Sequence, residues 1–95
     1  MGVSCMTRVN HTDTILVGTN SNLFVVDFKY DSKHPGASHF STTHKFPAIH
    51  SWLITSIAYY FDERASKLET YSVSRKDQYV TKIVLSNFKG SISSS

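Results

Sequence analysis

The sequence has little of what would place it outside the cell, in a membrane or around a metal. One cysteine in 95 residues allows no internal disulfide and no paired-cysteine zinc framework. No apolar run approaches the ~18 residues of a membrane span, and no charged leader precedes an apolar stretch at the N-terminus. These absences predict an intracellular protein, in the cytoplasm or nucleus, with no membrane partner.

Charge of one sign is not concentrated anywhere. The net charge of +3 comes from ten basic and seven acidic residues, and the longest basic run is the pair Arg75-Lys76. Scattered charge favours a solvated, weakly basic surface over a phosphate-binding patch. The alternative from another class is a small basic nucleic-acid-binding β domain that uses Arg75, Lys76, Lys82 and the aromatic side chains.

Helical periodicity is absent as well. Apolar residues do not recur at three-and-four spacing, and β-branched and aromatic residues dominate. The sequence therefore predicts an all-β protein of seven short antiparallel strands. The expected strands are 3–9, 14–19, 22–28, 39–46, 54–61, 68–74 and 79–86, with turn-forming residues between them.

Two stretches refine this prediction. Leu23-Phe24-Val25-Val26 and Ile15-Leu16-Val17 are continuous apolar runs, which predict strands covered on both faces. The Pro35-Gly36 pair breaks any strand and predicts a surface loop over 29–38. We expect one folded unit over 1–89, followed by a disordered Ser-rich tail over 90–95.

The chain also contains a weak internal repeat. Segments of the first half align with segments of the second half at an offset of about fifty residues. This offset is slightly longer than the ~40–45 residues of a WD repeat. His50-Ser51-Trp52-Leu53-Ile54 resembles the stretch that opens a WD repeat, although Ala48-Ile49 stands where Gly usually precedes the His. Val25-Val26-Asp27 resembles the closing Trp-Asp, with Val26 replacing Trp.

The resemblance implies four-stranded antiparallel blades of a WD-repeat-like β-propeller, with about two blades present. It also implies a buried structural network of the inter-blade His50, a serine of the second strand, which is Ser72 or Ser74, and Asp77 in the following turn. The Trp of this network is replaced near Ile83.

Ser, His and Asp also invite a catalytic reading, in which His50 takes a proton from a serine. No Gly-x-Ser-x-Gly turn exposes a serine, and no Gly-rich segment offers oxyanion-hole amides, so we predict no catalytic residues and no enzyme. His39 and His44 lie an odd number of residues apart on one expected strand. They should face opposite sides of it unless a bulge intervenes, so we predict no metal site and no cofactor.

About two blades cannot close a ring, and a propeller needs at least about four. We therefore expect a portion of a larger propeller, which needs further blades or self-association to cover its sheet edges. The expected function is a non-catalytic protein–protein interaction scaffold. Its candidate contact residues are Lys33 and His34 in one loop and Trp52 in another.

Overall fold

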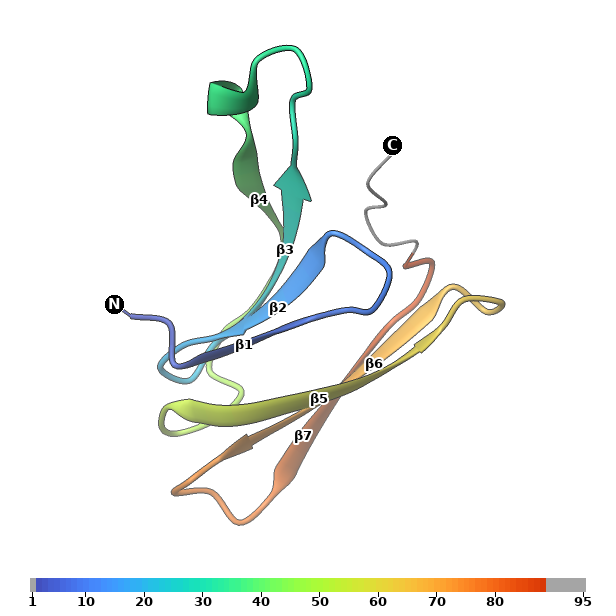
Figure 1. Cartoon of the computed structure of the whole chain (residues 1–95). Coiled ribbons are helices and arrows are strands. Elements are labelled where there is room, and N and C mark those ends of the chain that lie inside the picture. Colours follow the sequence, from blue (N-terminus) through green and yellow to red (C-terminus); the bar gives the residue numbers. More distant parts are fainter. Residues whose placement is uncertain (1, 89–95) are drawn as a thin grey trace.

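The computed structural model describes residues 2–88, which form two antiparallel sheets (Figure 1). The first sheet has the order β1-β2-β3-β4 and the second the order β5-β6-β7. The strands are β1 (Cys5–Arg8), β2 (Thr14–Gly18), β3 (Leu23–Lys29), β4 (His39–Phe46), β5 (Ile54–Asp62), β6 (Lys67–Ser74) and β7 (Val80–Leu85). The predicted all-β, antiparallel class is confirmed, and each predicted strand is present. The predicted tail, 90–95, lies outside the described residues.

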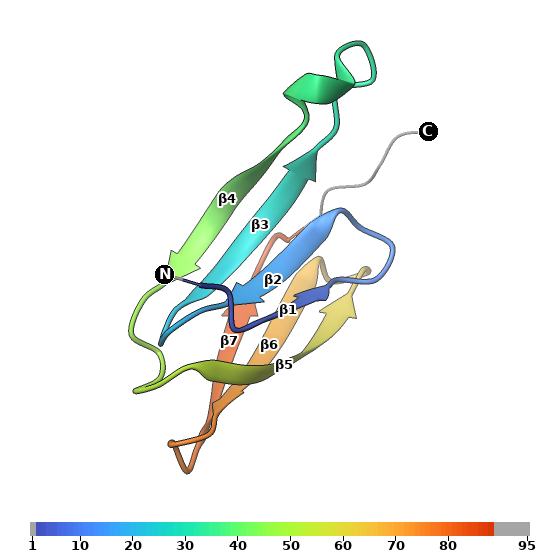
Figure 2. The same ribbon diagram turned by 60° about the vertical axis from the view of Figure 1, so that its left-hand side comes forward.

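Within each sheet, strands that are consecutive in the sequence pair with each other, so each sheet is a meander of hairpins. The first sheet has four strands, as a propeller blade would. The second has three among residues 2–88, so in that part of the chain β7 has no neighbour on its outer side. The β3–β4 connection, which includes the short 3-10 turn η1 (Pro35–Ala37), projects beyond the other hairpins (Figure 2).

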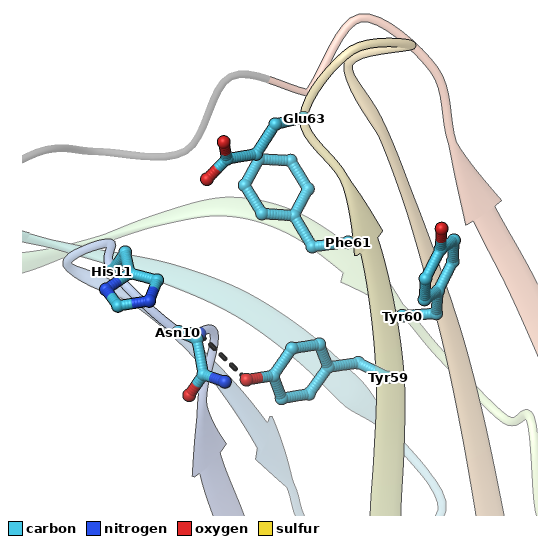
Figure 3. A pocket seen from close by; sticks show the side chains of 6 residues that line it. All are labelled: Asn10, His11, Tyr59, Tyr60, Phe61 and Glu63. Atoms are coloured by element: carbon cyan, nitrogen blue, oxygen red, sulfur yellow. Dashed lines mark hydrogen bonds between the residues drawn. The ribbon is translucent and has the colours of Figure 1, made fainter.

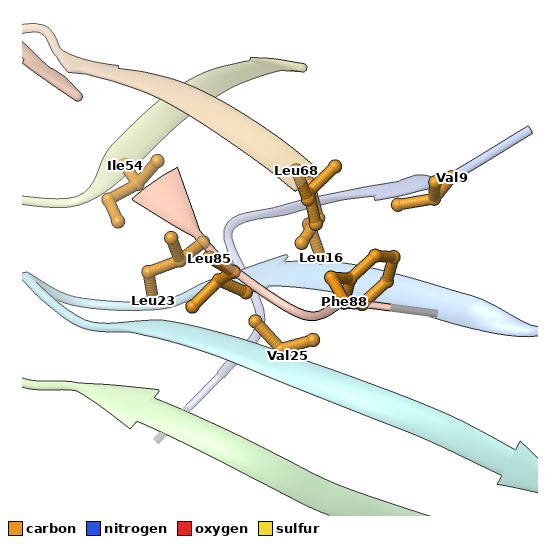
Figure 4. Packing of buried hydrophobic residues seen from close by; sticks show 8 residues of the cluster. All are labelled: Val9, Leu16, Leu23, Val25, Ile54, Leu68, Leu85 and Phe88. Carbon is orange, nitrogen blue, oxygen red and sulfur yellow. The ribbon is translucent and has the colours of Figure 1, made fainter. Parts of the chain in front are cut away.

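The hydrophobic core lies between the two sheets. Leu16, Leu23 and Val25 of the first sheet are fully buried and point toward the second sheet (Figure 4). Across the interface the core consists of Ile54, Leu68, Leu85 and Phe88, and Val9 closes one end of it. The sheets therefore form two layers around one core, as a domain of this size requires.

The expectation that β2 and β3 are covered on both faces is wrong for the described residues. The outward-facing side chains of these strands are half-buried, whereas their inward-facing neighbours are fully buried. They are Ile15, Val17, Phe24 and Val26. Only one layer packs on the first sheet here, so its outer face stays partly open. A run of apolar residues in a strand does not reveal whether a layer that would cover its other face belongs to the same chain segment.

The two sheets approach most closely at the edge strands β1 and β5. The Ser4 hydroxyl donates to the backbone oxygen of Ile54 at 2.7 Å. A Cβ on Gly18 would lie 2.9 Å from Cys5 Sγ and 3.0 Å from Ile54 Cβ, so a larger residue at this position would require these neighbours to shift. The two sheets are therefore packed most tightly along β1 and β5.

A β-bulge in β4 corrects the expectation for its two histidines. The register shifts between Val25 and Val26, so His44 pairs with Val25 and His39 with Lys29. Val25 and Lys29 point to the same face of β3, and so do the histidines paired with them. Among residues 2–88, no group of three His, Cys, Asp or Glu side chains is close enough to hold a metal ion.

Candidate functional site

The β4–β5 loop carries His50 into the interior of the molecule. Its backbone is tied to the β2–β3 turn, because Ile49 N–H donates to Ser21 O at 2.9 Å and Ser21 N–H donates to Trp52 O at 3.2 Å. Ala48 has φ 54°, and its N–H donates to the side-chain oxygen of Asn22 at 2.9 Å. Glycine adopts this left-handed conformation without strain, whereas it costs an alanine about 1 kcal/mol.

His50 joins two elements of the second sheet. Its Nδ1 lies 2.7 Å from Asp77 Oδ2 in the β6–β7 turn, and its Nε2 lies 3.0 Å from Ser72 Oγ on β6. The imidazole is fully buried, and 6% of the Asp77 side chain is exposed. Since a carboxylate only accepts, Nδ1 carries a proton and donates to Asp77. The structure thus brings together His50, Ser72 and Asp77.

Asp77 is also held by the residue after the histidine. Ser51 N–H donates to Asp77 Oδ2 at 3.1 Å, and the Ser51 hydroxyl donates to Asp77 Oδ1. The Ser51 hydroxyl is the main reason that the pKa of Asp77 is lowered, with contributions from Ser51 N–H and His50. The carboxylate therefore fixes the loop to the turn as an anion.

Ser74, the other serine considered for the network, is not part of it. Its hydroxyl is buried and has no hydrogen-bond partner among residues 2–88, whereas Ser72 contacts His50. Ile83, near the expected Trp position, is half-buried against the hydrophobic core. The position is therefore occupied by an apolar side chain that cannot donate a hydrogen bond.

The order Asp77, His50, Ser72 is the order of contacts in a catalytic triad. Ser72 is 0% exposed, and the imidazole beside it is fully buried. A nucleophile must reach the atom that it attacks, and this hydroxyl faces the protein interior. The arrangement can hold two elements together, but it offers no substrate a path to the serine.

The three predicted contact residues do not share one surface. Lys33 and His34 lie in the connection that precedes β4, and Trp52 lies in the loop that follows it. Because a strand is extended, the loops before and after it lie far apart, and Figure 2 shows these two loops at opposite ends of β4. Any contact through Lys33 and His34 is therefore separate from a contact through Trp52.

The structure shows one ring contact of Trp52 and one of His50 that were not predicted from the sequence. Lys76 Nζ lies 3.8 Å from the centroid of the Trp52 ring, and the Tyr79 ring is stacked on His50 with centroids 5.4 Å apart. Loss of hydration, and then the nearby Asp77 carboxylate, raise the pKa of Tyr79. The sequence signal was the group Arg75, Lys76 and Tyr79, which lies in the turn between β6 and β7.

A cleft opens at the opposite end of the sheets, where the β1–β2 and β5–β6 hairpins diverge (Figure 3). It measures about 460 Å³ and is lined by Asn10, His11, Tyr59, Tyr60, Phe61 and Glu63. Asn10 N–H donates to the Tyr59 hydroxyl at 2.8 Å across this end. Tyr60 points away from the Tyr59 and Phe61 rings (Figure 3), so the three rings do not form a cage.

Comparisons with known proteins identify no relative: no family model, curated protein or solved structure matches the chain. The part of the chain that the structure describes contains no helix long and apolar enough to cross a membrane.

Proposed function

We propose that this chain is a portion of a WD-repeat-like β-propeller, of about two blades, that serves as a non-catalytic protein–protein interaction scaffold inside the cell. The observation that carries this proposal is the buried contact of His50 with Asp77 and Ser72. It joins an inter-sheet loop to the second strand and the following turn of the next sheet, which is the linkage that the resemblance implies.

The arrangement of the sheets supports the same proposal. The two sheets are successive meanders, and their first strands, β1 and β5, lie closest to each other. The outer face of the first sheet carries half-buried apolar side chains, and the second sheet ends at the open side of β7 within residues 2–88. Further blades, or other copies of the chain, would cover both surfaces.

The way in which the polar groups are used also supports the proposed scaffold role. The serine, histidine and carboxylate that could perform acid–base chemistry are buried and bonded to one another. The exposed loops at both ends are carried by strand pairs, and a rigid framework that presents loops is the usual arrangement for binding. The proposal therefore includes no catalytic residue and no cofactor.

The nucleic-acid alternative receives less support. Lys82 is 3.4 Å from Glu69 and lies on the outer face of the second sheet, where it pairs with Tyr71. Arg75 and Lys76 lie in the β6–β7 turn instead. The basic side chains named for that function therefore do not line one track along which a phosphate backbone could run.

The test is photocrosslinking in cells from positions 47 and 78, which are exposed and lie in the β4–β5 loop and the β6–β7 turn, followed by reconstitution with the purified partner. We expect a stoichiometric protein complex that withstands nuclease and moderate salt. A complex that nuclease abolishes would reject the scaffold function in favour of nucleic-acid binding. Failure of every crosslinked protein to rebind as a pure component would reject it outright.

A further inference from the structure

One end of the molecule gathers three connections into a single exposed surface. The β2–β3 turn, the β4–β5 loop and the β6–β7 turn lie at the same end of the sheets (Figure 1). Backbone hydrogen bonds join Ser21 to the β4–β5 loop, and Asp77 joins that loop to the β6–β7 turn. The three connections are thereby fixed relative to one another.

This surface presents large apolar side chains to solvent. Exposed fractions are 40% for Trp52, 39% for Leu53, 53% for Tyr79 and 58% for Val80. Two of them are anchored by the network, because Tyr79 is stacked on the buried His50 and Trp52 is next to Ser51, which bonds Asp77. Rigid aromatic side chains lose little conformational entropy on binding, and interface centres are enriched in them.

The same surface carries positive charge that the protein leaves unneutralised. Arg75 and Lys76 form no ion pair with a carboxylate of residues 2–88. The connections 19–22, 47–53 and 75–79 contain one carboxylate, Asp77, and it is occupied by Ser51 and His50. The set of Trp52, Leu53, Arg75, Lys76, Tyr79 and Val80 is called the basic aromatic platform below.

We propose that the basic aromatic platform binds an acidic segment of a partner protein that also carries an apolar side chain. A carboxylate of that segment pairs with Lys76, whose ammonium is positioned over Trp52 at 3.8 Å, and with Arg75. The apolar side chain packs against Tyr79 and Val80, which are exposed and follow these cations within a few residues of the chain. The inference rests on the proposed scaffold function and names the chemistry of its partner.

A protein segment fits this surface better than a nucleic acid does. A nucleic-acid strand needs a row of cations along its backbone and free aromatic faces on which bases stack. The platform has two adjacent cations, Lys76 covers one face of Trp52, and His50 covers one face of Tyr79. Adjacent carboxylate and apolar side chains on a peptide match this compact arrangement.

The experiment uses the full chain and a short dye-labelled peptide in which Asp and Glu flank a Phe-Leu pair. Fluorescence anisotropy measures its affinity. Trp52 is the only tryptophan, so its emission reports whether binding occurs at the platform. We expect saturable binding with a change in Trp52 emission. The matched peptide with Asn and Gln should bind about tenfold more weakly, because it lacks the charge-assisted pairs.

Variants separate the platform from the rest of the surface. Lys76→Gln should weaken binding about two- to fivefold, as for an exposed ion pair, and Trp52→Ala about fivefold or more. Arg64→Gln, at an exposed position of the β5–β6 turn at the opposite end of the second sheet, is the control and should leave the affinity unchanged. Circular dichroism verifies that each variant remains folded.

Three results would overturn the inference: no saturable binding, equal affinity for the Asn/Gln peptide, or tighter binding of an oligouridylate of the same length. A reconstituted protein complex that tolerates both Lys76→Gln and Trp52→Ala would also overturn it, while leaving the scaffold function intact. Loss of the scaffold function would instead show as the absence of any reconstituted complex.

Discussion

His50 Nδ1 lies 2.7 Å from Asp77 Oδ2, although 27 positions separate the two residues in the sequence. This contact bridges the loop between the sheets and a turn of the second sheet. Because the imidazole is fully buried, its hydrogen bonds are not exchanged for bonds to water without local opening. The contact therefore persists only while the loop and the turn are both in their folded positions.

The first prediction concerns removal of this bridge. His50→Ala should lower the free energy of unfolding by about 2 kcal/mol or more, because it deletes buried hydrogen bonds and strands the Ser72 hydroxyl. His44→Ala, at an exposed position of β4, is the control and should change stability by less than about 0.5 kcal/mol. Urea unfolding measures both, and equal losses would contradict the structural role.

The two buried serines of β6 should respond in opposite ways. Ser72→Ala removes the partner of His50 Nε2 and should cost about 1–2 kcal/mol. Ser74→Ala removes a buried hydroxyl without a partner among residues 2–88, so it should be neutral or stabilising by up to about 1 kcal/mol. Thermal unfolding of the two variants side by side decides the point. If Ser74→Ala lost more stability than Ser72→Ala, the assignment of Ser72 to the network would be wrong.

The lowered pKa of Asp77 predicts sensitivity to acid. Its ordinary value is 3.8, and hydrogen bonds, first that of the Ser51 hydroxyl, bring the folded-state pKa below it. As the pH falls, the unfolded chain takes up this proton before the folded protein does. The stability that Asp77 contributes is therefore present above the unfolded-state value and is lost as the pH falls through the folded-state value.

The measurement is the free energy of unfolding as a function of pH for the unmodified chain and for Asp77→Asn. The variant should be less stable at neutral pH, and its stability should fall less steeply below pH 3.8. Glu63→Gln, an exposed carboxyl group in the β5–β6 turn, is the control. Parallel curves for Asp77→Asn and the unmodified chain would reject the assignment.

Ala48 provides a prediction about backbone strain. Its φ of 54° costs an L-residue about 1 kcal/mol. Glycine removes this strain but gains freedom in the unfolded chain. Ala48→Gly should therefore be neutral or stabilising by less than about 1 kcal/mol, whereas Ala58→Gly, within β5, should destabilise by about 0.5–1 kcal/mol. If both variants lose the same stability, the left-handed conformation of Ala48 is not occupied in solution.

The sequence was sufficient to predict the strands because polar turn residues mark their ends. Asn10 to Asp13 and Asn20 to Asn22 interrupt the apolar runs, and the structure places its first two hairpin turns there. The pairing of His50 with Asp77 and Ser72 was expected only through the resemblance, since no local pattern in the sequence links residues so far apart.

Other features depend on details that periodicity does not carry. The faces of His39 and His44 were predicted incorrectly because one bulged residue in β4 reverses the alternation. Lys76 over Trp52 was missed because it depends on how a turn of the second sheet folds back over the loop that enters it. The prediction that β2 and β3 are buried on both faces was wrong, because an apolar run in a strand does not indicate whether a second layer packs on the sheet.

The meander arrangement of the sheets has a consequence for the order of folding. Within each sheet, each strand pairs with the next one along the chain, so hairpins close short loops and can form quickly. The hydrogen bond from Ser4 to Ile54, by contrast, spans 50 positions and exists only when the sheets are stacked. We therefore expect the hairpins to gain order first and the crossing at Gly18 to close last.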